Sequence, residues 1–241
     1  MLLFDDESRN SGLNYGVCLR KTNGGPVVRL GEGTPYGLSA DGKRALAVID
    51  TPPQVVIYPT GPGETRHLPR GNLETYQSAD WFPDGQSVLI CGNEAGKASR
   101  CYSQDVSGGP PRPVTPEATT NGLVSPDGLR VLYSRTGGAY FAQPAGGGTA
   151  QAVPGLGADD QVIQWCADGR SVFVYRPTTV PFRIERLDLA SGRRELVREV
   201  APADRTGVLY GVGASLTDDA KSYAYDYKRM TSQLFVVEGA R

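Results

Sequence analysis

The chain has 241 residues, with 25 Lys and Arg against 26 Asp and Glu, and a formal net charge of −1 at pH 7. This balance, without a run of basic residues, argues against a nucleic-acid partner. No stretch approaches the roughly 18–20 apolar residues that span a bilayer, and the first residues lack a signal-peptide pattern. As written, the chain is expected to be cytoplasmic, or extracytoplasmic if it belongs to a membrane-anchored parent.

One short turn motif recurs along the chain, after a hydrophobic lead-in and before a β-rich run. The five copies are Ser39-Ala-Asp41-Gly42, Phe82-Pro-Asp84-Gly85, Ser125-Pro-Asp127-Gly128, Cys166-Ala-Asp168-Gly169 and the degenerate Thr217-Asp-Asp219-Ala220. The last residues of successive copies are 43, 43, 41 and 51 positions apart. Periods in the low forties with strand content predict the blades of a β-propeller.

Residues 79–121 show the elements of one repeat. The first two strands flank the Asp-Gly turn, a loop is predicted at 92–97, the third strand at 100–105, and the fourth at 111–115. A second, glycine-centred turn recurs before each fourth strand, at 22–26, 60–64, 144–149 and 190–193. Two turn signals with one period predict an all-β propeller of four-stranded antiparallel blades.

The ends of the chain correspond to incomplete blades. Residues 1–5 align with a second strand, and residues 215–238 supply strands one to three, the third at 233–238. These pieces fit a six-blade array most simply. The alternative is a five-blade ring, in which one hairpin would belong to no blade. We expect a single domain that is a fragment of a larger protein, with blade pieces at about 1–35, 36–78, 79–121, 122–160, 161–210 and 211–241.

The Ser-Pro-Asp-Gly turn followed by a hydrophobic strand resembles the repeat of TolB-type propellers, also called WD40-like or PD40 repeats. Segments 14–24, 187–196 and 222–225 look like the C-terminal propeller region of bacterial proteins with an N-terminal Ser/Thr kinase or winged-helix domain. The resemblance implies a sensory or protein-interaction module of a signalling protein. The expected partners of this chain within the parent protein are upstream blades or a kinase domain.

The four cysteines lack Cys-x-x-Cys spacing, so we expect no zinc site and favour reduced thiols on strands. Cys91 and Cys101 are the exception, because a hairpin between them would make a disulfide geometrically feasible. No Gly-x-Ser-x-Gly motif occurs, and the single histidine, His67, is expected on an exposed outer strand. Adjacent acidic pairs such as Asp159-Asp160 are interpreted as loop carboxylates. No cofactor or metal site is predicted.

Aromatic residues are assigned to packing between blades. Trp81 and Trp165 precede matching turns, and Tyr223, Tyr225 and Tyr227 alternate along one strand and therefore share a face. For each of these groups, contact with the neighbouring blade is favoured over a ligand platform.

The candidate binding site lies on the loop face opposite the Asp-Gly turns, where the sequence is irregular. Its predicted rim consists of Tyr36, Tyr76, Gln161, Arg176, Tyr210 and Arg229. We expect a non-catalytic module that binds a protein segment or small ligand there. The alternatives are a propeller enzyme of lyase or lactonase type, whose residues come from several blades, and the propeller cap of a peptidase whose catalytic domain is absent.

Overall fold

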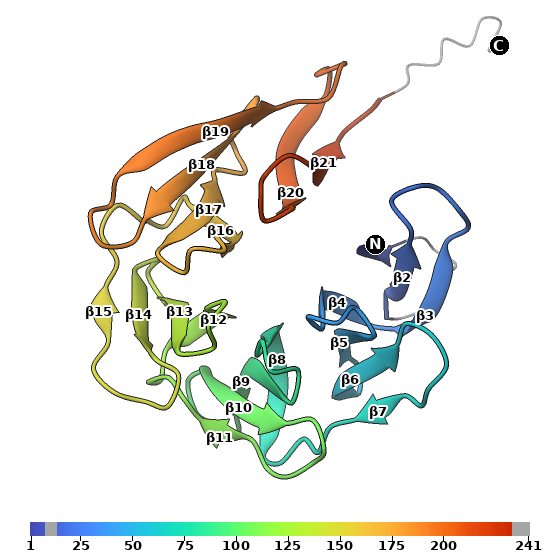
Figure 1. Ribbon diagram of the computed structural model, residues 1–241, viewed down its shortest axis with the longest axis vertical. Coiled ribbons are helices and arrows are strands. Elements are labelled where there is room, and N and C mark those ends of the chain that lie inside the picture. Colours follow the sequence, from blue (N-terminus) through green and yellow to red (C-terminus); the bar gives the residue numbers. More distant parts are fainter. Residues whose placement is uncertain (8–13, 233–241) are drawn as a thin grey trace, which may run out of the picture. The chain divides into compact units, whose positions relative to one another are not determined.

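The computed structural model describes residues 1–7 and 14–232, which form antiparallel β-sheets without a helix (Figure 1). Within these residues, accordingly, no helix is long and apolar enough to cross a membrane. The chain divides into two compact units, Met1–Val153 (unit 1) and Pro154–Arg241 (unit 2).

Unit 1 contains four sheets, and the strands of each follow one another in chain order. The first sheet has three strands: β1 (Leu2–Asp6), β2 (Gly16–Arg20) and β3 (Val28–Glu32). The other three have four strands each: β4 (Thr34–Leu38), β5 (Arg44–Asp50), β6 (Pro53–Pro59) and β7 (Arg66–His67); β8 (Leu73–Trp81), β9 (Ser87–Glu94), β10 (Arg100–Asp105) and β11 (Arg112–Pro113); β12 (Thr119–Val124), β13 (Arg130–Arg135), β14 (Tyr140–Pro144) and β15 (Gln151–Ala152).

Unit 2 contains one four-stranded sheet and one hairpin. The strands are β16 (Gln161–Trp165), β17 (Ser171–Tyr175), β18 (Phe182–Asp188) and β19 (Arg194–Val200), followed by β20 (Val208–Leu216) and β21 (Tyr223–Arg229). The strand predicted at 233–238 lies outside the described residues. The six sheets confirm the predicted all-β, six-blade propeller fold.

Two strand bounds in unit 1 differ from the prediction. Strand β8 begins at Leu73, six residues before the expected blade start at Ala79, because the whole segment pairs with β9. The loop predicted at 92–97 is shorter than expected. Gly92 is predicted to begin this loop, but β9 continues to Glu94 and pairs Gly92 with Arg100 of β10.

The recurring Asp-Gly turn has the same hydrogen bonds in each copy. In the third sheet, Gly85 N–H donates to the Phe82 carbonyl (2.9 Å), and the Asp84 carboxylate accepts from Gln86 N–H (2.8 Å). The four turn glycines have φ between 62° and 72°, the left-handed region in which a side chain is costly. Ala220 takes this position in the fifth copy, with φ 54°.

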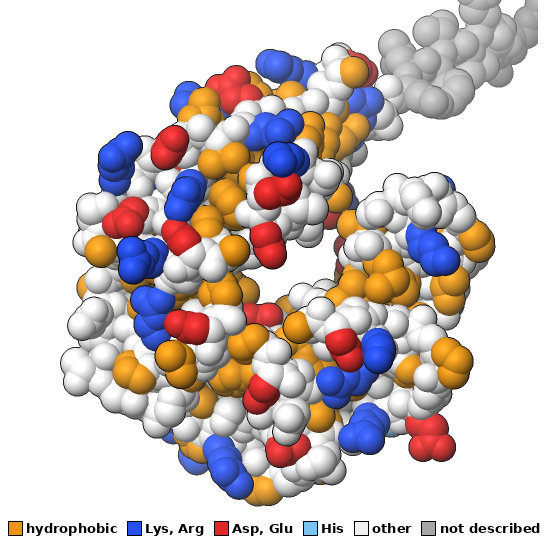
Figure 2. Space-filling model, in the orientation of Figure 1, with side chains coloured by type: hydrophobic (Ala, Val, Ile, Leu, Met, Phe, Trp, Pro, Cys, Tyr) orange, Lys and Arg blue, Asp and Glu red, His pale blue; other side chains and the backbone are white. Residues whose placement is uncertain are grey.

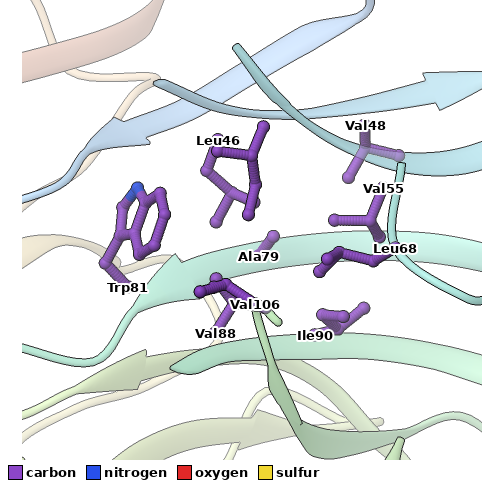
Figure 3. Packing of buried hydrophobic residues seen from close by; sticks show 10 residues of the cluster. Leu46, Val48, Val55, Leu68, Ala79, Trp81, Val88, Ile90 and Val106 are labelled. Atoms are coloured by element: carbon purple, nitrogen blue, oxygen red, sulfur yellow. The ribbon is translucent and has the colours of Figure 1, made fainter. Parts of the chain in front are cut away.

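Side chains from adjacent sheets form the core of unit 1. Leu46, Val48, Ala79, Val88 and Ile90 belong to one buried cluster that joins the β4–β7 and β8–β11 sheets (Figure 3). Trp81 belongs to the same cluster and is 7% exposed. The predicted packing role of Trp81 is therefore confirmed, and Trp165 is likewise buried.

Hydrogen bonds at one repeated position also connect neighbouring sheets. The Asp80 carboxylate on β8 accepts from Val124 N–H on β12 (2.8 Å), and the corresponding residue of the fifth sheet, Gln164, accepts from Leu216 N–H (3.4 Å). The indole N–H of Trp81 donates to the Gly37 carbonyl (3.2 Å). The residues just before the turn thus bond to the first strands of both the following and the preceding sheet.

Cys91 and Cys101 form a disulfide between directly opposite residues of β9 and β10, with Cα atoms 3.9 Å apart. The pair singled out as the exception to reduced thiols is therefore bonded, since both residues lie at facing positions of one hairpin. Cys18 and Cys166 are free and buried, as expected. His67 is exposed on the outer strand β7, which also agrees with the prediction.

The core of unit 2 includes Phe182 and Ile184 of β18. Tyr225 and Tyr227 of β21 pack against it, which confirms their assignment to contacts between sheets. Tyr223 stacks on Tyr225, with ring centroids 6.2 Å apart, but remains 40% exposed.

Candidate functional site

The predicted rim residues of unit 1 are partly buried. Tyr36 on β4 and Tyr76 on β8 both pack against the cluster that joins their two sheets. The Tyr36 hydroxyl donates to the Gln77 carbonyl (2.9 Å). Burial raises the pKa of Tyr76 to about 12. These two residues therefore contribute more to packing between sheets than to an open surface.

The four predicted rim residues of unit 2 lie at corresponding ends of four strands. Gln161 begins β16, Arg176 follows the end of β17, Tyr210 lies near the start of β20, and Arg229 ends β21. Antiparallel pairing puts these ends together, since Gln161 is opposite Tyr175 and Tyr210 is opposite Lys228. We call this region, with the loop 176–181, the loop end of unit 2.

Backbone contacts join the two halves of the loop end. Gly211 N–H donates to the Pro177 carbonyl (2.9 Å), so the chain around Tyr210 lies directly beside the residue after Arg176. Residues 34 positions apart in the sequence are thereby brought together. The ring of Tyr210 is 43% exposed there.

Three of the four rim side chains of unit 2 have polar partners. The Tyr175 hydroxyl donates to the Gln161 side chain (2.8 Å), and burial raises the pKa of Tyr175 to about 12. Arg229 forms an ion pair with Asp204 (3.3 Å) and lies over the Tyr227 ring, 5.7 Å from its centroid. Arg176 forms an ion pair that the sequence did not reveal, with Asp160.

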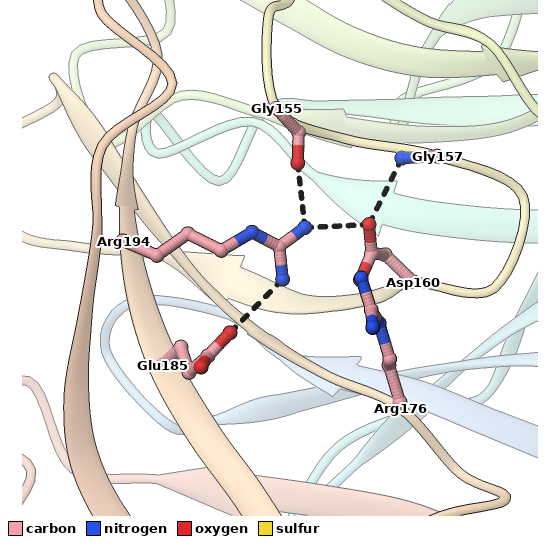
Figure 4. Close-up of polar contacts among 6 residues, drawn as sticks. All are labelled: Gly155, Gly157, Asp160, Arg176, Glu185 and Arg194. Carbon is pink, nitrogen blue, oxygen red and sulfur yellow. Dashed lines mark hydrogen bonds and ion pairs between the residues drawn. The ribbon is translucent and has the colours of Figure 1, made fainter.

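The buried carboxylate of Asp160 is the centre of an ionic cluster (Figure 4). Its side chain is 3% exposed and accepts from Arg194 (2.6 Å), Arg176 (3.1 Å) and Gly157 N–H (2.9 Å). Arg194 also pairs with Glu185 (3.0 Å). Burial opposes the charge on Asp160, but the hydrogen bonds from Arg194, Gly157 and Arg176 outweigh it and hold its pKa below the ordinary value.

The interpretation of Asp159-Asp160 as simple loop carboxylates missed this cluster. Asp160 directly precedes β16 and is buried, whereas its neighbour Asp159 is exposed. The pair of arginines that meets Asp160 comes from positions 16 and 34 residues further along the chain. No local spacing pattern signals contacts of that range.

A cavity of about 330 Å³ lies beside the cluster. Its lining consists of Arg176, Thr179, Arg183, Glu185 and Arg194. Arg176 and Arg183 are each more than half exposed, whereas Arg194 is 21% exposed and held by carboxylates. The cavity therefore has a fixed arginine on one side and two accessible arginines at its edge.

Basic and acidic side chains are interspersed over the visible face of unit 2 (Figure 2). Among residues 1–7 and 14–232, no group of three His, Cys, Asp or Glu side chains has the arrangement to hold a metal ion. The buried thiol of Cys166 has its pKa raised to about 11 by burial, which makes it a poor nucleophile at neutral pH.

No protein-family model matches the sequence, and no curated protein matches it either. The structure is similar to TolB from Acinetobacter baumannii, with a TM-score of 0.70 at 15% identity over 92% of this chain and 56% of that one. A putative TolB from Agrobacterium tumefaciens has a TM-score of 0.63 at 16% identity, over 85% of this chain and 74% of that one. The chain shares the TolB-type β-propeller fold.

An enzyme has the same fold. Oligogalacturonate lyase from Vibrio parahaemolyticus has a TM-score of 0.60 at 12% identity, over 91% of this chain and 65% of that one. The chain spans only about half the length of the first TolB structure. At these identities the likenesses show the fold alone, and the association with a kinase stays a prediction.

Proposed function

We propose that this chain is a non-catalytic β-propeller that binds a protein segment at the loop end of unit 2, as an accessory region of a larger signalling protein. The observation that carries the proposal is the convergence of Gln161, Arg176, Tyr210 and Arg229 on corresponding strand ends. Loops held by a rigid scaffold are common binding surfaces, and exposed Tyr and Arg side chains are typical anchors.

The fixed backbone supports this role. The bond between Gly211 and Pro177 holds the two loops together before any partner arrives. The contacts of Arg176 with Asp160 and of Arg229 with Asp204 restrict two of the long side chains. Such preorganisation reduces the entropy lost on binding.

The proposal is tested with peptides selected from a random library on the full chain. The informative variant is Tyr210→Ser, because Tyr210 is exposed, whereas a change at Arg176 would also disturb buried Asp160. We expect an affinity loss of about tenfold or more, measured by fluorescence anisotropy, with an unchanged melting temperature. The matched control is Leu129→Ser, 68% exposed and next to an Asp-Gly turn. Equal affinities of the two variants would contradict the proposal.

A propeller enzyme of lyase or lactonase type is the second candidate, favoured by the likeness to oligogalacturonate lyase. Incubation of the full chain with oligogalacturonate, with and without a divalent cation, tests it through the ultraviolet absorbance of an unsaturated product. The binding proposal expects no product. A role as the propeller cap of a peptidase would instead require a separate catalytic domain.

A further inference from the structure

We infer that the cavity beside Asp160 binds a carboxylate of an acidic peptide segment. The inference rests on the proposed function and names the chemistry of its partner. Three guanidinium groups, of Arg176, Arg183 and Arg194, and one carboxylate, of Glu185, line the cavity. Asp160 and Glu199 pair with these arginines from outside the lining, so the cavity wall itself is rich in donors.

The arrangement of these groups leaves the outer arginines able to meet a ligand. Asp160 and Glu185 are both held by Arg194, which is also bonded to the Gly155 carbonyl (Figure 4). Arg176 contacts Asp160 through Nε, so the two terminal nitrogens of its half-exposed guanidinium group lie beyond that contact. A guanidinium group binds a carboxylate through two parallel hydrogen bonds from such nitrogens.

Arg183 supplies the second accessible group. Its contact with Glu199 is long, at 3.9 Å, and both side chains are about half exposed. Exposed ion pairs of this kind contribute little, so an incoming carboxylate can compete with Glu199. The hydroxyl of Thr179 offers a further hydrogen-bond donor in the lining.

Because the carboxylates of Glu185, Asp160 and Glu199 equal the three guanidinium groups in number, the site favours a monoanion over a dianion. A phosphate dianion would bring a second negative charge towards Glu185 and Asp160, which like-charge repulsion disfavours. A peptide carboxylate in the cavity would also place the rest of the segment near Tyr210, because the loop that carries Arg176 is bonded to the strand of Tyr210. An acidic residue next to an apolar one therefore fits the surface.

The test uses two fluorescent peptides of equal length, one with Glu and one with Gln at the same positions among apolar residues, and the full chain. We expect the Glu peptide to bind about tenfold more tightly, with an affinity that falls as salt rises. Arg183→Gln should remove this preference and leave the Gln peptide unchanged. Arg193→Gln, in the exposed turn that directly precedes Arg194 but in the lining of a different pocket, should behave as the unmodified chain.

The outcomes separate this inference from the proposed function. If both peptides bind equally and still depend on Tyr210, the binding proposal stands and the carboxylate inference is wrong. If inorganic phosphate displaces the Glu peptide but acetate at the same ionic strength does not, the assignment to a carboxylate is wrong. If neither peptide binds, the carboxylate inference falls, and library peptides that depend on Tyr210 would still support the binding proposal.

Discussion

Ala220 occupies the turn position at which the other four complete turns have glycine. Its φ of 54° is in the left-handed region, where a Cβ atom is disfavoured. We predict that Ala220→Gly raises the free energy of unfolding by about 0.5–1 kcal/mol. Denaturant unfolding of the full chain measures this.

The reverse substitution in a complete turn is the matched control. Gly128 has φ 72°, and an added Cβ would lie 3.1 Å from Pro83 Cγ. Gly128→Ala should therefore lower the unfolding free energy by about 1 kcal/mol or more. A destabilising Ala220→Gly would show that the fifth turn does not have the geometry of the others.

Asp80 makes stability depend on pH. Burial raises its pKa to about 6, although the backbone N–H groups of Val124 and Trp81 favour the charged form. Between about pH 4 and pH 6 the folded chain holds a proton at Asp80 that the unfolded chain has released. The unfolding free energy contributed by Asp80 should therefore fall as pH rises through this interval, by up to about 3 kcal/mol.

Asp80→Asn removes the titrating group and should flatten the stability profile between about pH 4 and pH 6. The titration of Asp168 does not affect the stability profile in this pH interval. Burial alone would raise its pKa, but bonds from Arg170 N–H, Arg186 and Ser171 lower it to about 2. The unfolding free energy contributed by Asp168 is therefore lost only as pH falls below about 4. An unchanged slope in the variant would assign the dependence to another group.

At the scale of elements, the disulfide and the neighbouring sheet fit closely. An added Cβ at Gly122 of β12 would lie 2.9 Å from Cys101 Sγ and 2.9 Å from Leu89 Cδ2. We predict that Gly122→Ala costs about 1–3 kcal/mol, because this core has no room for a methyl group. In a Cys91→Ala, Cys101→Ala background the cost should be smaller, and a double-mutant cycle measures the difference. Equal costs in both backgrounds would contradict this packing.

The strands were predictable where turns mark their ends. The bounds of β10 agree with the predicted 100–105, because loops flank it on both sides. The start of β8 was missed by six residues, because pairing with β9 extends it through polar residues such as Glu74. Pairing with a neighbouring strand depends on the tertiary fold, so local residue preferences do not predict how far pairing extends a strand.

At the scale of the molecule, the period of the turn motif was enough to predict six sheets. Part of the predicted rim lies together in the structure: the loop end of unit 2 contains Gln161, Arg176, Tyr210 and Arg229. Tyr36 and Tyr76 instead pack between sheets of unit 1. The cluster around Asp160 was not predictable, because Asp160, Arg176 and Arg194 come from separate strands and loops. The repeat predicts where the strands end, but it does not predict which side chains from different strands and loops form contacts.

Hydrogen exchange of the full chain, with and without the tightest library peptide, tests the proposed binding surface most directly. We predict slower exchange at residues 176–183 and 207–211, where the bond between Gly211 and Pro177 joins the two loops. The Asp-Gly turns at 82–85 and 125–128 should exchange at unchanged rates. Protection confined to those turns, or none at the loop end of unit 2, would contradict the account.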